Sequence, residues 1–331
     1  MTRTLRTAQD LADAGLIAPP SVSALAAVAE RYSIAVTPAM AALIRQAGAP
    51  IARQYLPEPD ELITAPHELD DPTADAPFTP VKGVVHRYPD RALLKPLLAC
   101  PVYCRFCFRR EAVGPDGGLL TEDELEAALD WFAATPSVRE VILTGGDPLM
   151  LSPRRLRQIL GRLAAMPHIE TLRIHSRVPV ADPSRITPGM LAALTLERPL
   201  YLCVHANHAA EFTDQTANGL RGLHAAGLVL LGQSVLLRGV NDSEAALEAL
   251  FRAMLRHRVK PYYLHQLDPA PGTARFHVPE EEGLALLRGL RGRVTGLAWP
   301  TYVREQAEGA GKIPLGMAGM RGGAGQAREA V

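Results

Sequence analysis

The sequence predicts an α/β fold in which six β-α units form a partial TIM-type barrel behind an N-terminal helical arm. From position 81 onward, short runs rich in Val, Ile, Leu and Tyr alternate with segments of helical period, a pattern typical of repeated β-α units and a parallel sheet. Before position 64 the apolar residues recur at helical spacing, interrupted by Pro19, Pro20 and Pro57. We therefore expect a helical arm at 1–80, a barrel at 81–295 and a short C-terminal segment at 296–331.

Each unit of the expected barrel can be placed on the sequence. The strands are expected at 93–99, 138–143, 171–176, 199–205, 228–237 and 260–267. The helices are expected at 122–134, 153–165, 187–194, 211–226, 243–257 and 280–290. Ser152 followed by Pro153 is a favourable helix start, and Gly227 stands where a helix should end. The small, polar tail from Gly322 is expected to be disordered.

The composition excludes several classes of function. Lys plus Arg and Asp plus Glu number 35 each, so no net charge attracts the chain to nucleic acid or to an anionic membrane, and a small-molecule substrate is favoured. The N-terminal stretch has no signal-peptide core, and no later apolar run approaches the length of a membrane span, which predicts a cytoplasmic protein. Three of the four cysteines are closely spaced, which indicates metal binding in a reducing compartment rather than a disulfide framework.

Polar residues recur where the expected strands end. In parallel barrels the chemistry collects at the C-terminal ends of the strands, so these residues are expected to share one rim. Along the chain they are Cys100, Gly145, Gly146, Asp147, His175, Arg177, His205, Asn207, Gln233 and Asp268. Their repeated placement predicts a functional site on that rim.

The cysteine loop CPVYCRFC, which contains Cys100, Cys104 and Cys107, is the most specific motif. Thiolates suit iron, and three of them on a four-iron cluster leave one iron open to a substrate or cofactor. The alternative is a structural zinc site completed by Cys203 or His205, although structural zinc prefers CxxC pairs. A lone cysteine such as Cys203 is more often a buried core residue.

The cysteine loop followed by TGGDPL after the next expected strand resembles the radical S-adenosylmethionine (SAM) superfamily. The resemblance implies a [4Fe–4S] cluster on the three cysteines, with SAM bound to the open iron. It also implies that Gly145, Gly146 and Asp147 lie against the methionine amino group of SAM, for which an ordinary tight turn is the alternative. His205 and Gln233 match positions that contact SAM, where a hydrogen-bonded residue of the barrel interior is the alternative.

A wider set of strings resembles the lysine 2,3-aminomutase family from about position 81 to 314: HRYPDR, CFRR, LRIHSR, HANH, QSVLLRGVND, YYLHQLD and GAGK. The resemblance implies that Lys312 forms a Schiff base with pyridoxal 5′-phosphate (PLP) and that Arg87 and Arg91 hold its phosphate. The alternatives are a solvated lysine and exposed helix charges. A phosphate-binding P-loop is excluded, because Gln306 and Ile313 occupy its first glycine and its Ser/Thr position.

The same resemblance assigns the substrate contacts. Arg109 matches the arginine that pairs with the substrate carboxylate, and Asp268 matches a carboxylate that receives the distal ammonium of lysine. Glu305 stands where longer members of the family usually carry Asp, so it keeps the charge but adds a methylene. The alternative for Asp268 is the start of an Asp-Pro turn.

The activity implied by the resemblance is that of an L-lysine 2,3-aminomutase, an isomerase that makes (R)-β-lysine by an adenosyl-radical, PLP-assisted migration of the amino group. LRIHSR, YYLHQLD and an end soon after Lys312 are most similar to the shorter branch that serves elongation factor P. The implied partners are L-lysine, a reductant such as flavodoxin or ferredoxin, and elongation factor P with its lysyl ligase. Further copies of the same chain, in a homo-oligomer, are also compatible with the resemblance. The alternatives are an aminomutase for free β-lysine metabolism and a non-catalytic, metal-stabilised binding protein.

Overall fold

The computed structural model describes residues 3–114, 117–306 and 311–316, and in these residues nine strands lie side by side in chain order. The strands are β1 (Val84–Tyr88), β2 (Arg91–Leu97), β3 (Glu140–Gly145), β4 (Thr171–Ser176), β5 (Leu200–His205), β6 (Val229–Val235), β7 (Lys260–His265), β8 (Thr301–Gln306) and β9 (Gly311–Pro314). Strands β2 to β8 are parallel, while β1 and β9 pair antiparallel at the two edges. The predicted α/β barrel is confirmed, and it is nearly closed.

The six expected strands correspond to β2–β7, and β1, β8 and β9 are additional. Strand β8 continues the parallel series beyond the expected units. Strands β1 and β2 form a hairpin around Tyr88 and Arg91, so the alternative that Arg87 and Arg91 are exposed charges on a helix is wrong. The additional strands have five, six and four residues and mix polar with apolar side chains, so they lack a long apolar run.

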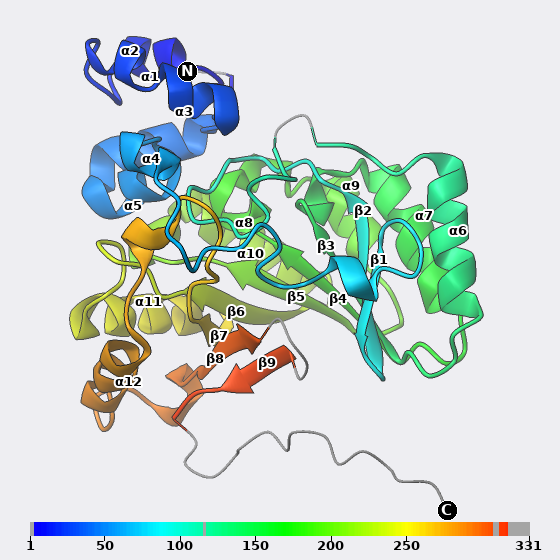
Figure 1. Ribbon diagram of the computed structural model, residues 1–331. Helices are drawn as coiled ribbons and strands as arrows, with labels where there is room; N and C mark the ends of the chain where they lie inside the picture. The colour runs from blue at the N-terminus through cyan, green and yellow to red at the C-terminus, as the bar shows by residue number, and fades with distance from the viewer. Residues whose placement is uncertain (1–2, 115–116, 307–310, 317–331) are drawn as a thin grey trace, which may run out of the picture.

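Helices follow the strands and pack against the sheet (Figure 1). They are α6 (Glu122–Ala133), α7 (Pro153–Ala164), α8 (Val178–Ala181), α9 (Pro188–Leu194), α10 (Asp214–Ala225), α11 (Glu244–Arg256) and α12 (Glu280–Gly289). The Ser152 hydroxyl accepts a hydrogen bond from the Arg155 N–H at 3.2 Å, and Gly227 has a φ of +91°, as their cap positions predict. Among the described residues, no helix combines the length and the apolar character needed to cross a bilayer.

The main hydrophobic core lies between the strands and these helices. Leu143, Leu172 and Leu202 on neighbouring strands are fully buried, as are Leu160 and Leu223 on the helices that cover them. Each such side chain contributes about 1.5–3 kcal/mol when it leaves water. This core fixes the strand ends that carry the polar residues of the site.

The helical arm has a second core of its own. The arm contains α1 (Ala8–Asp13), α2 (Ser21–Ala24), α3 (Ala26–Arg31), α4 (Pro38–Ala47) and α5 (Ala49–Tyr55), drawn in blue in Figure 1. Its buried residues include Leu11, Val28 and Ile51, and they pack with Val102 and Tyr103 of the cysteine loop. The arm is therefore part of the wall that holds the cysteine loop.

The expected domain boundaries at 80/81 and 295/296 stay predictions. Strands β8 and β9 belong to the expected C-terminal segment and pair with the sheet of the barrel. The expected disorder of the tail from Gly322 falls outside the described residues.

Candidate active site

A cavity of about 760 Å³ occupies the interior of the barrel. The fourteen residues to which the sequence assigns a role all line it: Arg87, Arg91, Cys100, Cys104, Cys107, Arg109, Gly145, Gly146, Asp147, His205, Gln233, Asp268, Glu305 and Lys312. Of the other expected rim residues, His175 and Arg177 line it and Asn207 does not. They converge because parallel strands in chain order bring their ends and inward-facing residues to one interior.

The cysteine loop follows β2 and is held by the helical arm. The N–H of Tyr103 donates to the carbonyl of Ala35 at 3.0 Å, and the N–H of Arg105 donates to the carbonyl of Gln54 at 2.9 Å. Burial raises the pKa of the Cys104 thiol to about 12. Because metal ligands are thiolates, these buried thiols need the positive charge of a metal centre to ionise at neutral pH.

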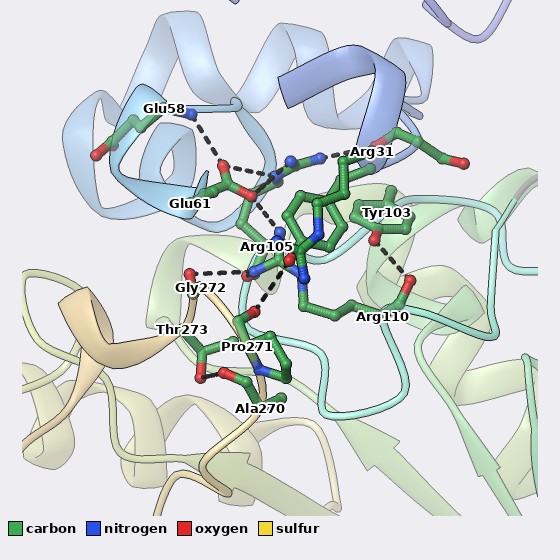
Figure 2. Close-up of polar contacts among 12 residues, drawn as sticks. Arg31, Glu58, Glu61, Tyr103, Arg105, Arg110, Ala270, Pro271, Gly272 and Thr273 are labelled. Carbon is green, nitrogen blue, oxygen red and sulfur yellow. Dashed lines mark hydrogen bonds and ion pairs between the residues drawn. The ribbon is translucent and has the colours of Figure 1, made fainter. Parts of the chain in front are cut away.

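Two arginines beside the cysteines are anchored by one buried carboxylate of the arm, Glu61 (Figure 2). Arg105 donates from Nε to both oxygens of Glu61, at 3.0 and 2.9 Å, and from Nη2 at 2.5 Å, and both side chains are fully buried. Arg110 donates to the same Oε2 atom and, from Nη1, to the carbonyl of Gly272 at 3.1 Å. The arm, the cysteine loop and the loop after β7 therefore meet at one carboxylate.

The charge of Glu61 is stabilised by its partners. Burial raises the pKa of Glu61, but the charges of Arg105 and Arg110 outweigh burial and hold the pKa below its usual value. Arg275 approaches the carboxylate at 3.4 Å, and Arg110 also lies over the ring of Tyr32, 3.6 Å from its centroid. Arg105 and Arg110 therefore share one anion, while Arg275 also pairs with Glu58.

Gly145 and Gly146, at the end of β3, are required by the backbone that leads into the cysteine loop. Gly145 has a φ of +104°, and a Cβ on Gly146 would lie 2.3 Å from the carbonyl oxygen of Ala99. The N–H of Gly146 donates to the carbonyl of Leu97 at 2.8 Å. The absence of side chains at these glycines therefore lets the backbone just before Cys100 pack closely against them.

Asp147 uses both carboxylate oxygens within the protein. Oδ1 accepts from the Leu149 N–H at 3.0 Å and the Ser176 hydroxyl at 2.8 Å, and Oδ2 accepts from the N–H groups of Arg177 at 2.7 Å and Val178 at 2.9 Å. Burial nevertheless raises the pKa of Asp147 above its usual value. This carboxylate links the C-terminal ends of β3 and β4. Because both of its oxygens already accept hydrogen bonds, the segment 145–147 can offer a ligand its backbone rather than this side chain.

Arg177 and His205 keep buried nitrogens unpaired beside the cysteine loop. Arg177 donates to the Tyr55 hydroxyl at 2.9 Å and to Glu211 at 3.1 Å, but its Nη1 has no hydrogen-bond partner among the described residues, and neither has His205 Nε2. Burial, and next the charge of Arg177, hold the pKa of His205 well below its usual value, so the ring is neutral. Gln233 lies opposite His205 in the pairing of β5 with β6.

Lys312, on β9, shares a carboxylate with Arg87. Glu305 accepts from Lys312 Nζ at 2.7 Å through Oε2 and from Arg87 Nη1 at 2.7 Å through Oε1. The Lys312 N–H donates to the Tyr88 hydroxyl at 2.8 Å, and a Cβ on Gly311 would lie 1.9 Å from that hydroxyl. The expected ammonium site at Glu305 is therefore already paired with two cations of the chain.

The two arginines expected to hold a phosphate differ in their surroundings. Arg87 lies over the ring of Phe78, 5.0 Å from the centroid, and its buried Nη2 has no partner within the described part of the chain. Arg91 lies over Tyr88, 3.7 Å from the centroid, and pairs with the neighbouring Asp90 at 2.7 Å. Arg87 thus keeps a buried donor for an anion.

Arg109 and Asp268 are the two remaining expected substrate contacts. Arg109 Nη2 lies 2.9 Å from Asp75 Oδ2, a partner that the sequence does not single out. Burial, and next the charge of Glu305, raise the pKa of Asp268 to about 7, against the charges of Lys312 and Arg109. A buried acid in this state is stabilised as an anion when a cationic ligand enters.

Two half-buried histidines on the cavity wall, His175 and His265, have no specific role assigned from the sequence. Burial, and next the charge of Arg173, hold the pKa of His175 well below its usual value, and burial and Lys312 lower the pKa of His265 to about 3. Both rings are neutral, and His175 Nε2 is buried without a partner among the residues described. Their positions in LRIHSR and YYLHQLD, near the C-terminal ends of β4 and β7, could have indicated that both rings line the cavity.

Comparisons with known proteins define first the class and then the family. Residues 94–250 match the family model described as the Radical SAM superfamily. A curated L-lysine 2,3-aminomutase from Fusobacterium nucleatum subsp. nucleatum is 38% identical over 288 residues, covering 86% of this chain and 68% of that protein. That from Clostridium subterminale is 38% identical over 284 residues, covering 85% and 68%, and that from Escherichia coli (strain K12) is 39% identical over 270 residues, covering 80% and 78%. The chain therefore belongs to the L-lysine 2,3-aminomutase family of radical SAM enzymes, which are isomerases.

Among solved structures, a radical SAM methyltransferase from Sphaerobacter thermophilus aligns with a TM-score of 0.44 at 20% identity, over 67% of this chain and 69% of that chain.

The cofactors of the family are a [4Fe–4S] cluster, SAM and PLP, and the residues of the cavity fit these groups. Three half-buried thiols and the unpaired nitrogens of Arg177 and His205 lie at the cysteine loop, where a cluster and the polar end of SAM would be held. An unpaired nitrogen of Arg87 accompanies Lys312, where a phosphate and a carbonyl would be held. Unpaired buried donors of this kind are costly unless a ligand completes them.

We predict that Glu61→Gln destabilises the protein by about 3–5 kcal/mol, because Arg105 and Arg110 remain buried without their counter-ion. Urea unfolding followed by circular dichroism measures the change. The matched control is Glu126→Gln, which breaks the exposed pair with Arg162 and should change stability by less than about 0.5 kcal/mol. Equal stability of both variants would contradict the anchoring role of Glu61.

We predict that Asp268→Asn stabilises the substrate-free protein at alkaline pH. The folded-state pKa of Asp268, about 7, lies above the usual value of 3.8, so the cost of ionising it is absent below pH 4, grows between these values and is complete above pH 7. The variant should therefore exceed the wild type by about 2–4 kcal/mol at pH 8 and by nothing at pH 4. Urea unfolding at the two pH values measures this, and a difference independent of pH would refute it.

Proposed function

We propose that this protein is an L-lysine 2,3-aminomutase that converts L-lysine to (R)-β-lysine. The observation that carries the proposal is the set of charges in one cavity, which offers Arg109 to a carboxylate and Asp268 to an ammonium beside Lys312 and three cysteines. Lysine carries both complementary charges. A substrate ending in a second carboxylate would instead meet Asp268 as a like charge.

When bound, the cluster and SAM supply an adenosyl radical that removes hydrogen from carbon 3 of lysine, and PLP supports the migration of nitrogen from carbon 2 to carbon 3. In the proposal, the three cysteines hold the cluster, and the backbone of 145–147, with His205 and Gln233, contacts SAM. The carboxylate of Asp147 does not contact SAM in this proposal. It holds the C-terminal ends of β3 and β4 together through its hydrogen bonds to Ser176 and Arg177. The nearly closed barrel excludes water from these reactive groups.

Lys312 is the lysine proposed to bind PLP covalently, with Arg87 and Arg91 on the phosphate. Glu305 Oε2, at 2.7 Å from Lys312 Nζ, is placed to take the proton that this amine must lose before it reacts. Glu305 then lies beside Asp268 as a second anion for the distal ammonium of the substrate. Glu305 can therefore pair with Lys312 before PLP is attached and with the substrate ammonium afterwards.

The use of the product in the modification of elongation factor P is the finer part of the proposal. It is supported by LRIHSR and YYLHQLD, the two strings that are most similar to the shorter branch of the family. A gene for elongation factor P or its lysyl ligase next to the gene for this protein would favour that use over free β-lysine metabolism. The proposed electron donor is flavodoxin or ferredoxin.

We expect protein reconstituted anaerobically with iron and sulfide to carry a four-iron cluster whose electron paramagnetic resonance spectrum changes when SAM binds, and to turn over L-lysine. Replacing Cys100, Cys104 or Cys107 by Ala should remove both signal and turnover, because each thiolate binds one iron. Cys203→Ala is the matched control and should keep both, since Cys203 is buried in β5. Stoichiometric zinc without iron would refute the assignment and favour a binding protein.

We expect borohydride to attach PLP to Lys312, as located by peptide mass spectrometry. Lys312→Ala should lose this label and keep the iron content, because the cysteine loop belongs to a different part of the cavity wall. Lys260 is the internal control, since its amine is already hydrogen-bonded to the carbonyls of Pro261 and Trp299. A label on Lys260 or Lys95 would show that the covalent site is elsewhere.

A further inference from the structure

Asp75 holds one edge of the guanidinium that is proposed to bind the substrate carboxylate. Its Oδ2 atom lies 2.9 Å from Arg109 Nη2 and 3.3 Å from Arg109 Nε, and it also accepts from Lys95 Nζ at 3.3 Å. Arg109 Nη1 makes no hydrogen bond to the described residues, so the far edge of the guanidinium remains for a second carboxylate. A planar guanidinium can serve two carboxylates in this way, one on each edge.

The position of Asp75 is fixed by the protein. It lies in the segment before β1, where its N–H donates to Asp71 at 3.0 Å and its Oδ1 accepts from the Thr73 hydroxyl at 3.3 Å. The preceding Ala74 has a φ of +48°, which is unfavourable for alanine. The contacts of the surrounding segment must maintain this conformation. The same segment is pinned to the loop after β7, where Glu68 accepts from the N–H of Thr273 at 2.9 Å.

A substrate carboxylate bound beside Asp75 would be repelled by its negative charge, and Lys95 offsets this repulsion. Arg109 and Asp75 alone have no net charge, so a substrate carboxylate would gain little from them and would meet a like charge. With Lys95, the three side chains carry a net charge of +1, which matches one carboxylate. Only 15%, 16% and 19% of the Arg109, Asp75 and Lys95 side chains are exposed, so water screens their charges poorly.

Lys95 is placed to act through Asp75 rather than on the substrate. It lies on β2, its stem packs against Gly145, where a Cβ would approach the Lys95 Cβ to 2.9 Å, and it does not line the cavity that Arg109 and Asp75 line. We propose that Lys95 and Asp75 are positioning residues for the carboxylate of the substrate: Asp75 orients Arg109, and Lys95 neutralises Asp75 so that Arg109 accepts a second carboxylate. The inference rests on the proposed role of Arg109.

The test is equilibrium binding of L-lysine to the protein loaded with cluster and PLP, without SAM, so that no turnover occurs. Lys95→Met should weaken binding about tenfold, because Asp75 then cancels the charge of Arg109. Asp75→Asn added to Lys95→Met should restore binding to within about threefold of the wild type, since Arg109 alone again carries +1. Lys82→Met, which removes an exposed lysine paired with Glu124, is the matched control and should bind as the wild type does.

L-lysinamide, which lacks the carboxylate, separates the electrostatic role from a structural one. The wild type and Lys95→Met should bind it equally, and Lys95→Arg should bind L-lysine as the wild type does. Equal weakening for both ligands, or a double variant weaker than Lys95→Met, would overturn the inference. A wild type that binds no L-lysine, or Arg109→Met with unchanged affinity, would instead overturn the proposed function and this inference with it.

Discussion

The buried carboxylate of Glu61 is the constraint on which the geometry of the site depends. It is the shared counter-ion of Arg105 and Arg110, which flank the last two cysteines, and it belongs to the helical arm. A buried cation without its anion costs several kcal/mol, so the cysteine loop cannot shift away from Glu61 while both arginines stay buried. The thiols are therefore held at fixed separations by charge pairing as well as by the packing of Tyr103.

The same principle recurs throughout the cavity, where carboxylates hold the cations that face the ligands. Asp75 holds Arg109, Glu305 holds Arg87 and Lys312, and Glu211 holds Arg177. Most of these carboxylates come from other parts of the chain than the cations that they bind. Each cation keeps its charge and orientation while at least one donor stays available, which is the condition for a prearranged site.

The parts that the sequence predicts well are those encoded locally. The cysteine loop and the glycines after β3 are short motifs, and the strand pattern alone brings them to one cavity with Lys312 and Asp268. The partners Glu61, Asp75 and Glu211 could not be predicted in these roles, because a charged residue has the same local signature whether it is solvated or buried against a distant ion. Strands β1, β8 and β9 were missed for a related reason, since their stability comes from pairing at the sheet and not from apolar runs of their own.

Strand β1 contacts the last two strands through its side chains: the Tyr88 hydroxyl accepts from the backbone N–H of Lys312 on β9, and Arg87 pairs with Glu305 on β8. The ribosome makes β1 early and β9 late, so the parallel strands between them can form on a growing chain well before Lys312 has been added. If Lys312 binds PLP as proposed, covalent attachment must wait until synthesis has passed β9. A chain that stalls before β9 would already contain the cysteine loop, but it would lack the amine that is proposed to bind PLP.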